Sequence, residues 1–93
     1  MFYDYLTDYQ KALENHKKAL EIRLPINGEF HTDIADIYEK IAVIFANLKD
    51  YWQALENQKK ALEISLQTYG EFDSKTADAY YSVAIKYYFV NDY

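Results

Sequence analysis

The sequence contains no cysteine, and only two glycines and one proline occur among its 93 residues. Without cysteine, the chain can form neither a disulfide nor a thiolate metal site. Glycine and proline disfavour helices, whereas the Ala, Leu, Lys and Glu that recur along this chain favour them. The composition therefore predicts an all-helical chain, and its length corresponds to a single small domain.

Positive charge and long apolar runs are also scarce. The formal net charge is -5 at pH 7, and no cluster of Lys and Arg supplies the basic surface that nucleic acids require. No window approaches the roughly 18 consecutive apolar residues of a membrane span, and the N-terminus lacks the pattern of a signal peptide. We expect a cytoplasmic protein that binds neither nucleic acid nor membranes, with basic or neutral partners.

Motifs for catalysis and metal binding are missing as well. The two histidines, His16 and His31, have no carboxylate at ligand spacing, and we interpret His16 as a partly buried packing residue. The chain has no glycine-rich phosphate loop and no nucleophile with a base beside it. We predict that the protein is not an enzyme and has no catalytic residues, no cofactor and no metal.

What the sequence does contain is an internal repeat of 42 residues. Asp8-Tyr9 returns as Asp50-Tyr51, and the segment KKALEI at 17–22 returns unchanged at 59–64. When residues 8–49 are aligned with residues 50–91, 20 of the 42 positions are identical. A fixed period of this length indicates one helical unit stacked on copies of itself, because a single unit cannot bury its own apolar face.

Apolar residues recur at three- and four-residue steps in each unit, which predicts two amphipathic helices per unit. We expect one domain over residues 1–93 with outer helices at about 9–25 and 51–69, inner helices at about 32–48 and 74–90, and partial units at both ends. Residues 2–6 are interpreted as the tail of an earlier inner helix. Pro25 should end the first outer helix, and Gly70 should close the second as a left-handed cap. His31 or Thr32 should begin the first inner helix, although His is a poor N-cap.

The connection between residues 48 and 51 leaves an alternative open. No glycine or proline interrupts Leu48-Lys49-Asp50-Tyr51, so two helices could continue as one and exchange between chains in a dimer. Asp50 is a good N-cap type, which favours a turn instead.

The order of large and small residues resembles a known repeat family. The residues that carry the resemblance are Tyr38, Ile41, Ala42, Phe45, Tyr51, Ala54, Ala61 and Leu66. They fall at the spacing of the tetratricopeptide repeat, in which paired antiparallel helices stack into an α-solenoid. The segment ALEIR at 19–23, followed by Gly28, His31, Asp33 and Ala35, is similar to the 42-residue kinesin-light-chain variety. The resemblance covers essentially the whole chain.

This resemblance implies that the inner helices line a concave groove that binds an extended peptide or a partner protein. By position, the groove residues are Asp36, Glu39, Val43, Asn47, Asp78, Tyr81, Ile85 and Tyr88. Carboxylates and tyrosines suit a segment with basic and apolar side chains. Glu39 and Tyr81 stand where better-known forms of the fold carry basic or asparagine side chains. We therefore do not expect the ligand specificities of those forms in this chain. The alternative for the three groove residues Tyr81, Ile85 and Tyr88 is packing against a neighbouring repeat.

The last inner helix is rich in tyrosine, and the next outer helix would begin only at Asp92-Tyr93. We expect either a piece of a longer array or a chain that covers its ends by self-association, as a homo-oligomer or a chain-exchanged dimer. Two functions follow. The first is a protein–protein interaction scaffold, and the second is a structural or self-assembling repeat that oligomerises through its uncapped ends without a dedicated ligand.

Overall fold

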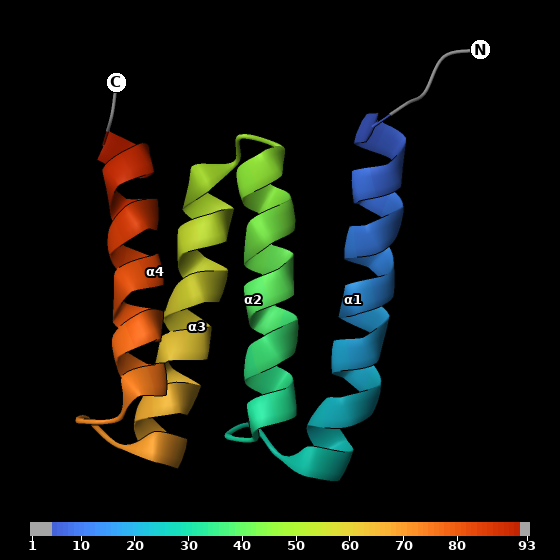
Figure 1. Ribbon diagram of the computed structural model, residues 1–93. Coiled ribbons are helices and arrows are strands. Elements are labelled where there is room, and N and C mark those ends of the chain that lie inside the picture. The colour runs from blue at the N-terminus through green and yellow to red at the C-terminus, as the bar shows by residue number, and fades with distance from the viewer. Residues whose placement is uncertain (1–4, 92–93) are drawn as a thin grey trace.

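The computed structural model describes residues 5–91, which form four α-helices joined by short turns. The helices are α1 (Tyr5–Asn27), α2 (Thr32–Asn47), α3 (Tyr51–Tyr69) and α4 (Ser74–Asn91). Each helix runs antiparallel to the one before it (Figure 1). The described residues contain no strand, which confirms the all-helical fold class.

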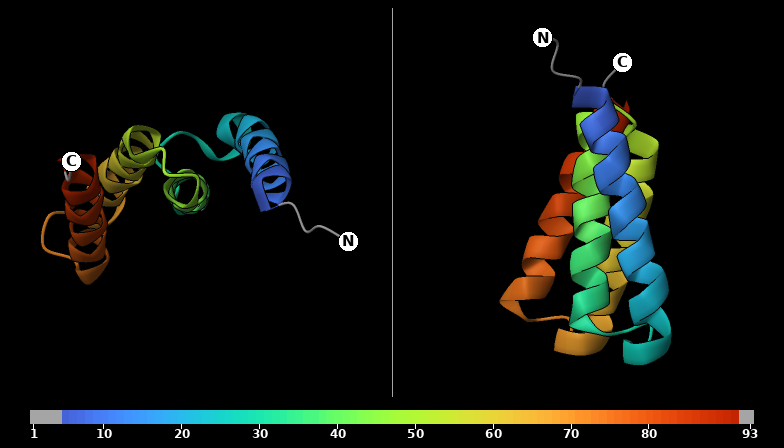
Figure 2. Two further views of the ribbon diagram at one scale, coloured as in Figure 1. Left: turned by 90° about the horizontal axis from the view of Figure 1, so that it is seen from above. Right: turned by 90° about the vertical axis from the view of Figure 1, so that its right-hand side faces the viewer.

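The helices alternate between two rows. Seen from above, α1 and α3 lie in one row and α2 and α4 in the other (Figure 2). Within the described part of the chain, backbones come close only between helices that are consecutive in sequence. The molecule is therefore a flat stack, 48 × 36 × 17 Å along its principal axes, as an α-solenoid of helix pairs should be.

The core lies between consecutive helices, on both sides of α2 and between α3 and α4. One cluster joins Ile34 and Ala35 of α2 to Ala61 and Ile64 of α3. Leu20, Leu24 and Tyr38 pack against this cluster, the first two of them from α1. A second cluster joins Leu55 of α3 to Val83 and Val90 of α4. Helices α2 and α3 thus connect the whole stack, because each packs on a helix at either side.

The first helix differs from the prediction at both ends. It continues through Pro25 to Asn27, and the expected end near Leu24 is wrong. Proline removes one backbone donor, but the Gly28 N–H still donates to the Leu24 carbonyl at 3.0 Å and closes the last turn. At the other end, Tyr5 and Leu6 belong to α1 itself, with no turn at residue 7, while residues 2–4 of the expected inner-helix tail lie outside the described residues.

The helix caps come from side chains at the turns. The Asp50 carboxylate accepts a hydrogen bond from the Gln53 N–H at 3.3 Å, as expected for an N-cap. His31 also acts as an N-cap, contrary to expectation, because its Nδ1 atom accepts from the Asp33 N–H at 3.0 Å. At Gly70 the chain takes a φ of 88°, a conformation that glycine adopts without steric cost.

The turn between α2 and α3 separates the two helices within one chain. The Asp50 N–H donates to the Phe45 carbonyl at 2.9 Å, and the Lys49 N–H donates to the Ala46 carbonyl at 3.0 Å. This turn is not the continuous helix that a chain-exchanged dimer would need. Lys49 has a φ of 66°, in the left-handed region that costs most residues about 1 to 2 kcal/mol.

Replacing this lysine by glycine should stabilise the protein. Relief of the left-handed strain exceeds the extra backbone entropy of glycine, so Lys49→Gly is expected to raise the free energy of unfolding by about 0.5 to 1 kcal/mol. Urea unfolding followed by circular dichroism measures the change. The control is Lys40→Gly on the exposed side of α2, which should lose about 1 kcal/mol because glycine disfavours a helix interior. Equal losses in both variants would contradict the strain argument.

Candidate functional site

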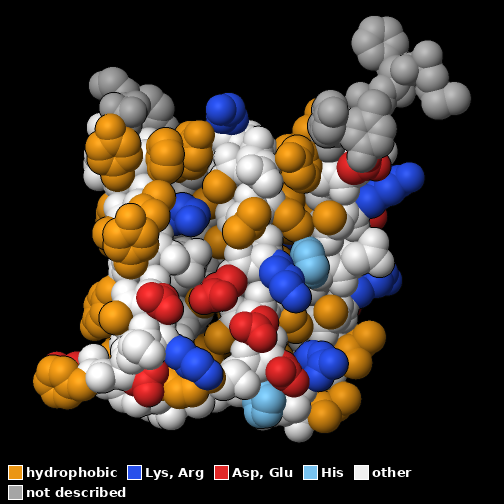
Figure 3. All heavy atoms as spheres, viewed as in Figure 1, with side chains coloured by type: hydrophobic (Ala, Val, Ile, Leu, Met, Phe, Trp, Pro, Cys, Tyr) orange, Lys and Arg blue, Asp and Glu red, His pale blue; other side chains and the backbone are white. Residues whose placement is uncertain are grey.

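The eight predicted groove residues all lie on α2 and α4, the helices of one row (Figure 2). Seven of them are exposed, and Glu39 is half-buried. In the space-filling view, Asp and Glu side chains gather near the centre of this face, and apolar side chains follow the α4 edge (Figure 3). The surface thus has an acidic part near the start of both helices and an apolar part further along them.

The acidic part contains a pocket of about 450 Å³ between α2 and α4, with the end of α3 forming a further wall. Its lining residues are Thr32, Ala35, Asp36, Glu39, Ile64, Ser65, Tyr69, Lys75 and Asp78. Three of these residues, Asp36, Glu39 and Asp78, were predicted from the sequence. The other six were not, and three of those come from the outer helix α3.

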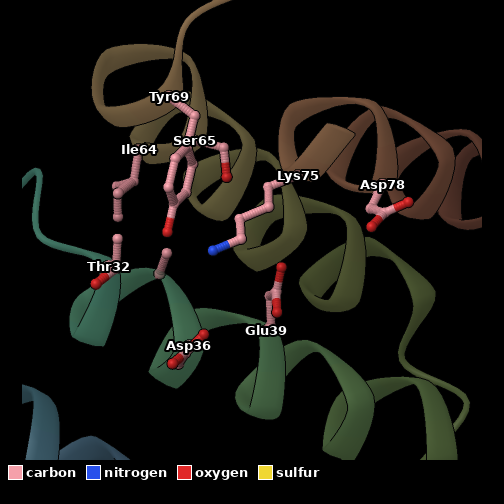
Figure 4. A pocket seen from close by; sticks show the side chains of 9 residues that line it. Thr32, Asp36, Glu39, Ile64, Ser65, Tyr69, Lys75 and Asp78 are labelled. Carbon is pink, nitrogen blue, oxygen red and sulfur yellow. The ribbon is translucent and has the colours of Figure 1, made fainter. Parts of the chain in front are cut away.

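The carboxylates of this pocket form no close ion pair within the described residues. None of the ion pairs in residues 5–91 involves Asp36, Glu39 or Asp78. Lys75 lies on the lining, and its Nζ atom is 4.7 Å from the ring centroid of Tyr69. The Lys75 amine and the Tyr69 hydroxyl point into the pocket, with Glu39 facing them from α2 (Figure 4).

The protonation equilibrium of Glu39 reflects its burial and the charges around it. Burial raises the pKa of Glu39, and repulsion from Asp36 and Asp78 raises it further, while the positive charge of Lys86 acts in the opposite direction. Burial lowers the pKa of Lys86, and the attraction of Glu39 partly restores it. Ionisation of the Glu39 carboxylate therefore carries an electrostatic cost, which a cation entering the pocket from outside would reduce.

The apolar part of the surface is formed chiefly by α4. Tyr81 is 70% exposed, and the Tyr88 side chain is exposed as well but contacts the Phe89 ring edge-on at 5.6 Å between centroids. Phe89 in turn stacks on Tyr51 of α3 at 5.0 Å. The Tyr88 ring thus packs on Phe89, which itself packs on Tyr51, whereas Tyr81 projects from α4. No neighbouring repeat among the described residues covers these tyrosines.

The described part of the chain provides no group of three Asp, Glu, His or Cys side chains placed to hold a metal ion. Of the helices in residues 5–91, none combines the length and apolar character needed to cross a bilayer.

Small residues mark the places where α2 and α3 approach each other. Ala42, Ala54 and Ala61 have no exposed surface, and Ala61 packs in one cluster with Ala35, against which Tyr38 also packs. The sequence pattern of the tetratricopeptide repeat matches residues 1–67 and, in a second overlapping match, residues 33–93. The chain belongs to the tetratricopeptide repeat family. Comparison with curated proteins gives no match. Tetratricopeptide repeats are in general protein–protein interaction modules, and the family is typically a non-enzymatic scaffold.

The tetratricopeptide groove should respond to pH through Glu39. Its raised pKa means that the ionised form destabilises the folded state, a penalty that is complete above the folded-state pKa and absent below the ordinary value of 4.5. Glu39→Gln is therefore expected to raise the melting temperature at neutral pH, with a gain that shrinks as the pH falls and vanishes below that value. Thermal melts across this pH range, with the exposed Glu14→Gln as control, measure it. A gain that does not depend on pH would contradict the electrostatic origin.

Proposed function

We propose that the protein is a non-enzymatic tetratricopeptide scaffold that binds an extended peptide in the groove of α2 and α4. The peptide carries a Lys or Arg next to apolar side chains. One observation carries the proposal: the carboxylates of Asp36, Glu39 and Asp78 surround a pocket without an internal ion pair. The exposed ring of Tyr81 on the same face supports the apolar half of the motif.

In this proposal the basic side chain of the peptide enters the pocket, and its aliphatic stem lies against Ile64 and the Tyr69 ring. A Lys or Arg side chain fits the volume of about 450 Å³. An exposed ion pair contributes only about 0 to 1 kcal/mol, but the half-buried position of Glu39 reduces solvent screening. The next apolar side chain of the peptide packs on Tyr81, whose large surface orders at small entropic cost.

The finer assignment of the repeat is part of the proposal. We assign the chain to the kinesin-light-chain-like variety and regard residues 1–93 as one domain of about two units with partial units at both ends, supported by the 42-residue period. Glu39 and Tyr81 distinguish its groove from the forms with basic or asparagine side chains. The cytoplasmic location stays a prediction.

The peptide specificity can be tested by selecting binders from a random-peptide display library. Selected sequences are expected to be enriched in Lys or Arg beside apolar residues, and a synthetic peptide of that kind should bind more weakly as salt increases. Asp78→Asn is expected to cost about 0.5 to 1 kcal/mol of binding free energy and Tyr81→Ala about 1 to 2 kcal/mol, by fluorescence polarisation. Selection of acidic peptides would contradict the proposal.

Tyr80→Ala is the matched control for Tyr81→Ala, because the two residues are adjacent on α4 and both are exposed. Tyr80 is not among the predicted groove residues, so its replacement should leave peptide affinity unchanged. Circular dichroism should show full helicity in both variants. Loss of folding in Tyr81→Ala would instead support the interpretation of this residue as a packing residue.

Self-association is a second candidate function, favoured by a different observation. Large apolar side chains of α4 are exposed, among them Tyr80 and Tyr87, although the Lys59 amine of α3 lies 6.0 Å from the centroid of the Tyr87 ring. A face of this kind commonly marks a protein–protein contact. This function does not depend on the acidic pocket.

A further inference from the structure

Equivalent residues of α2 and α4 have different surroundings. Ala42 of α2 has no exposed surface, whereas Ala84, its equivalent 42 residues later, is exposed. Tyr38 packs against the core cluster, while the equivalent Tyr80 is 49% exposed. The cause is that α3 covers this side of α2, and no helix among the described residues covers it on α4. We call this side of α4, defined by Ala77, Tyr80 and Ala84, the open α4 face.

A second open surface lies at the opposite end of the stack, on α1. Ile22 is 64% exposed, whereas its equivalent Ile64 in α3 is 3% exposed. Ala19 is only half-buried, whereas the equivalent Ala61 is fully buried. The other apolar stripe of α1 packs on the core cluster, so this stripe is a separate one. We call it the open α1 face, defined by Ala12, Ala19 and Ile22.

The two open faces are the two halves of an interface that already exists inside the chain. Between α2 and α3, Ala61 and Ile64 pack on Ala35, and the Lys60 amine lies 5.3 Å from the Tyr38 ring centroid. The open α1 face carries the same residues at the equivalent positions, because residues 17–22 and 59–64 are identical. The open α4 face carries Ala77 and Tyr80 in place of Ala35 and Tyr38.

We infer that a second copy of this chain docks its α1 on the open α4 face, in the way that α3 packs on α2. The inference rests on self-association, the second function proposed above. In this junction Ala19 and Ile22 of one copy pack on Ala77 of the other, and the Lys18 amine lies over the Tyr80 ring as Lys60 lies over Tyr38. The new contact continues the internal stack of helix pairs with the same type of packing.

The inferred junction is heterologous, because it joins two different faces at opposite ends of the molecule. Each added copy leaves one open α1 face and one open α4 face, so association does not stop at a dimer. The inner helices of successive copies would share one row, and the peptide groove would continue from copy to copy. A partner with several binding segments would then gain avidity without new contacts.

Solution mass tests the junction on the 93-residue chain. Light scattering coupled to gel filtration is expected to show a mass that rises with concentration above 11.1 kDa and passes twice that value. Ile22→Glu and Tyr80→Glu should each weaken association at least tenfold, because a carboxylate then enters an apolar contact. The control is Trp52→Glu, which changes an exposed ring outside both open faces and should leave the mass unchanged. Helicity should be retained in all three variants.

Cross-linking tests the pairing of faces directly, since the chain has no cysteine of its own. A mixture of Ile22→Cys and Ala77→Cys proteins treated with a short bismaleimide should form the mixed dimer in far higher yield than either protein alone. Trp52→Cys mixed with Ala77→Cys is the control and should give only background. Cross-linking of Ala77→Cys with itself would overturn the junction while leaving self-association intact. A mass of 11.1 kDa at all concentrations would overturn both, and neither result bears on peptide binding in the groove.

Discussion

The close approach of α2 and α3 is the constraint on which the other features of this structure depend. Ala35 of α2 and Ala61 of α3 are buried together at this contact, and a larger side chain there would push the helices apart. Because the helices lie close, Ile34 and Ile64 can meet in one cluster that also receives Leu20 and Leu24 from α1. The arrangement in two rows follows from this packing. Each helix packs only on the helices before and after it in the sequence.

The groove is a consequence of the same arrangement. The outer helix α3 packs on both α2 and α4, which leaves the remaining sides of these two helices free for polar and aromatic residues. Their spacing places Asp36, Glu39 and Asp78 around one pocket, where burial and mutual repulsion raise the pKa of Glu39. The negative charge of the pocket therefore results from the positions at which the two helices carry these carboxylates. It does not require a contiguous sequence motif.

Sequence periodicity was sufficient to predict the helical fold and the stacking of units, whereas the eight groove residues came from the family resemblance and stay a prediction. It could not predict Lys75 and Tyr69 in the pocket, because helical spacing indicates which residues share a face but not which side chain of a neighbouring helix end reaches it. The errors at the ends of helices have local causes. A single hydrogen bond to Leu24 carries α1 past Pro25, and a ring nitrogen lets His31 act as a cap.

The repeat also shows that identical sequence does not ensure an identical environment. Residues 17–22 and 59–64 carry the same letters, yet Ile64 is buried and Ile22 is exposed, because α3 has a helix at either side and α1 has only α2 among the described residues. The same reasoning separates Tyr38 from Tyr80. In a stacked array, the burial of a residue depends on whether another helix packs against it as much as on its own side-chain chemistry. Each copy of the repeat therefore carries the residues of both halves of the internal interface, and the neighbouring helix decides which of them are buried.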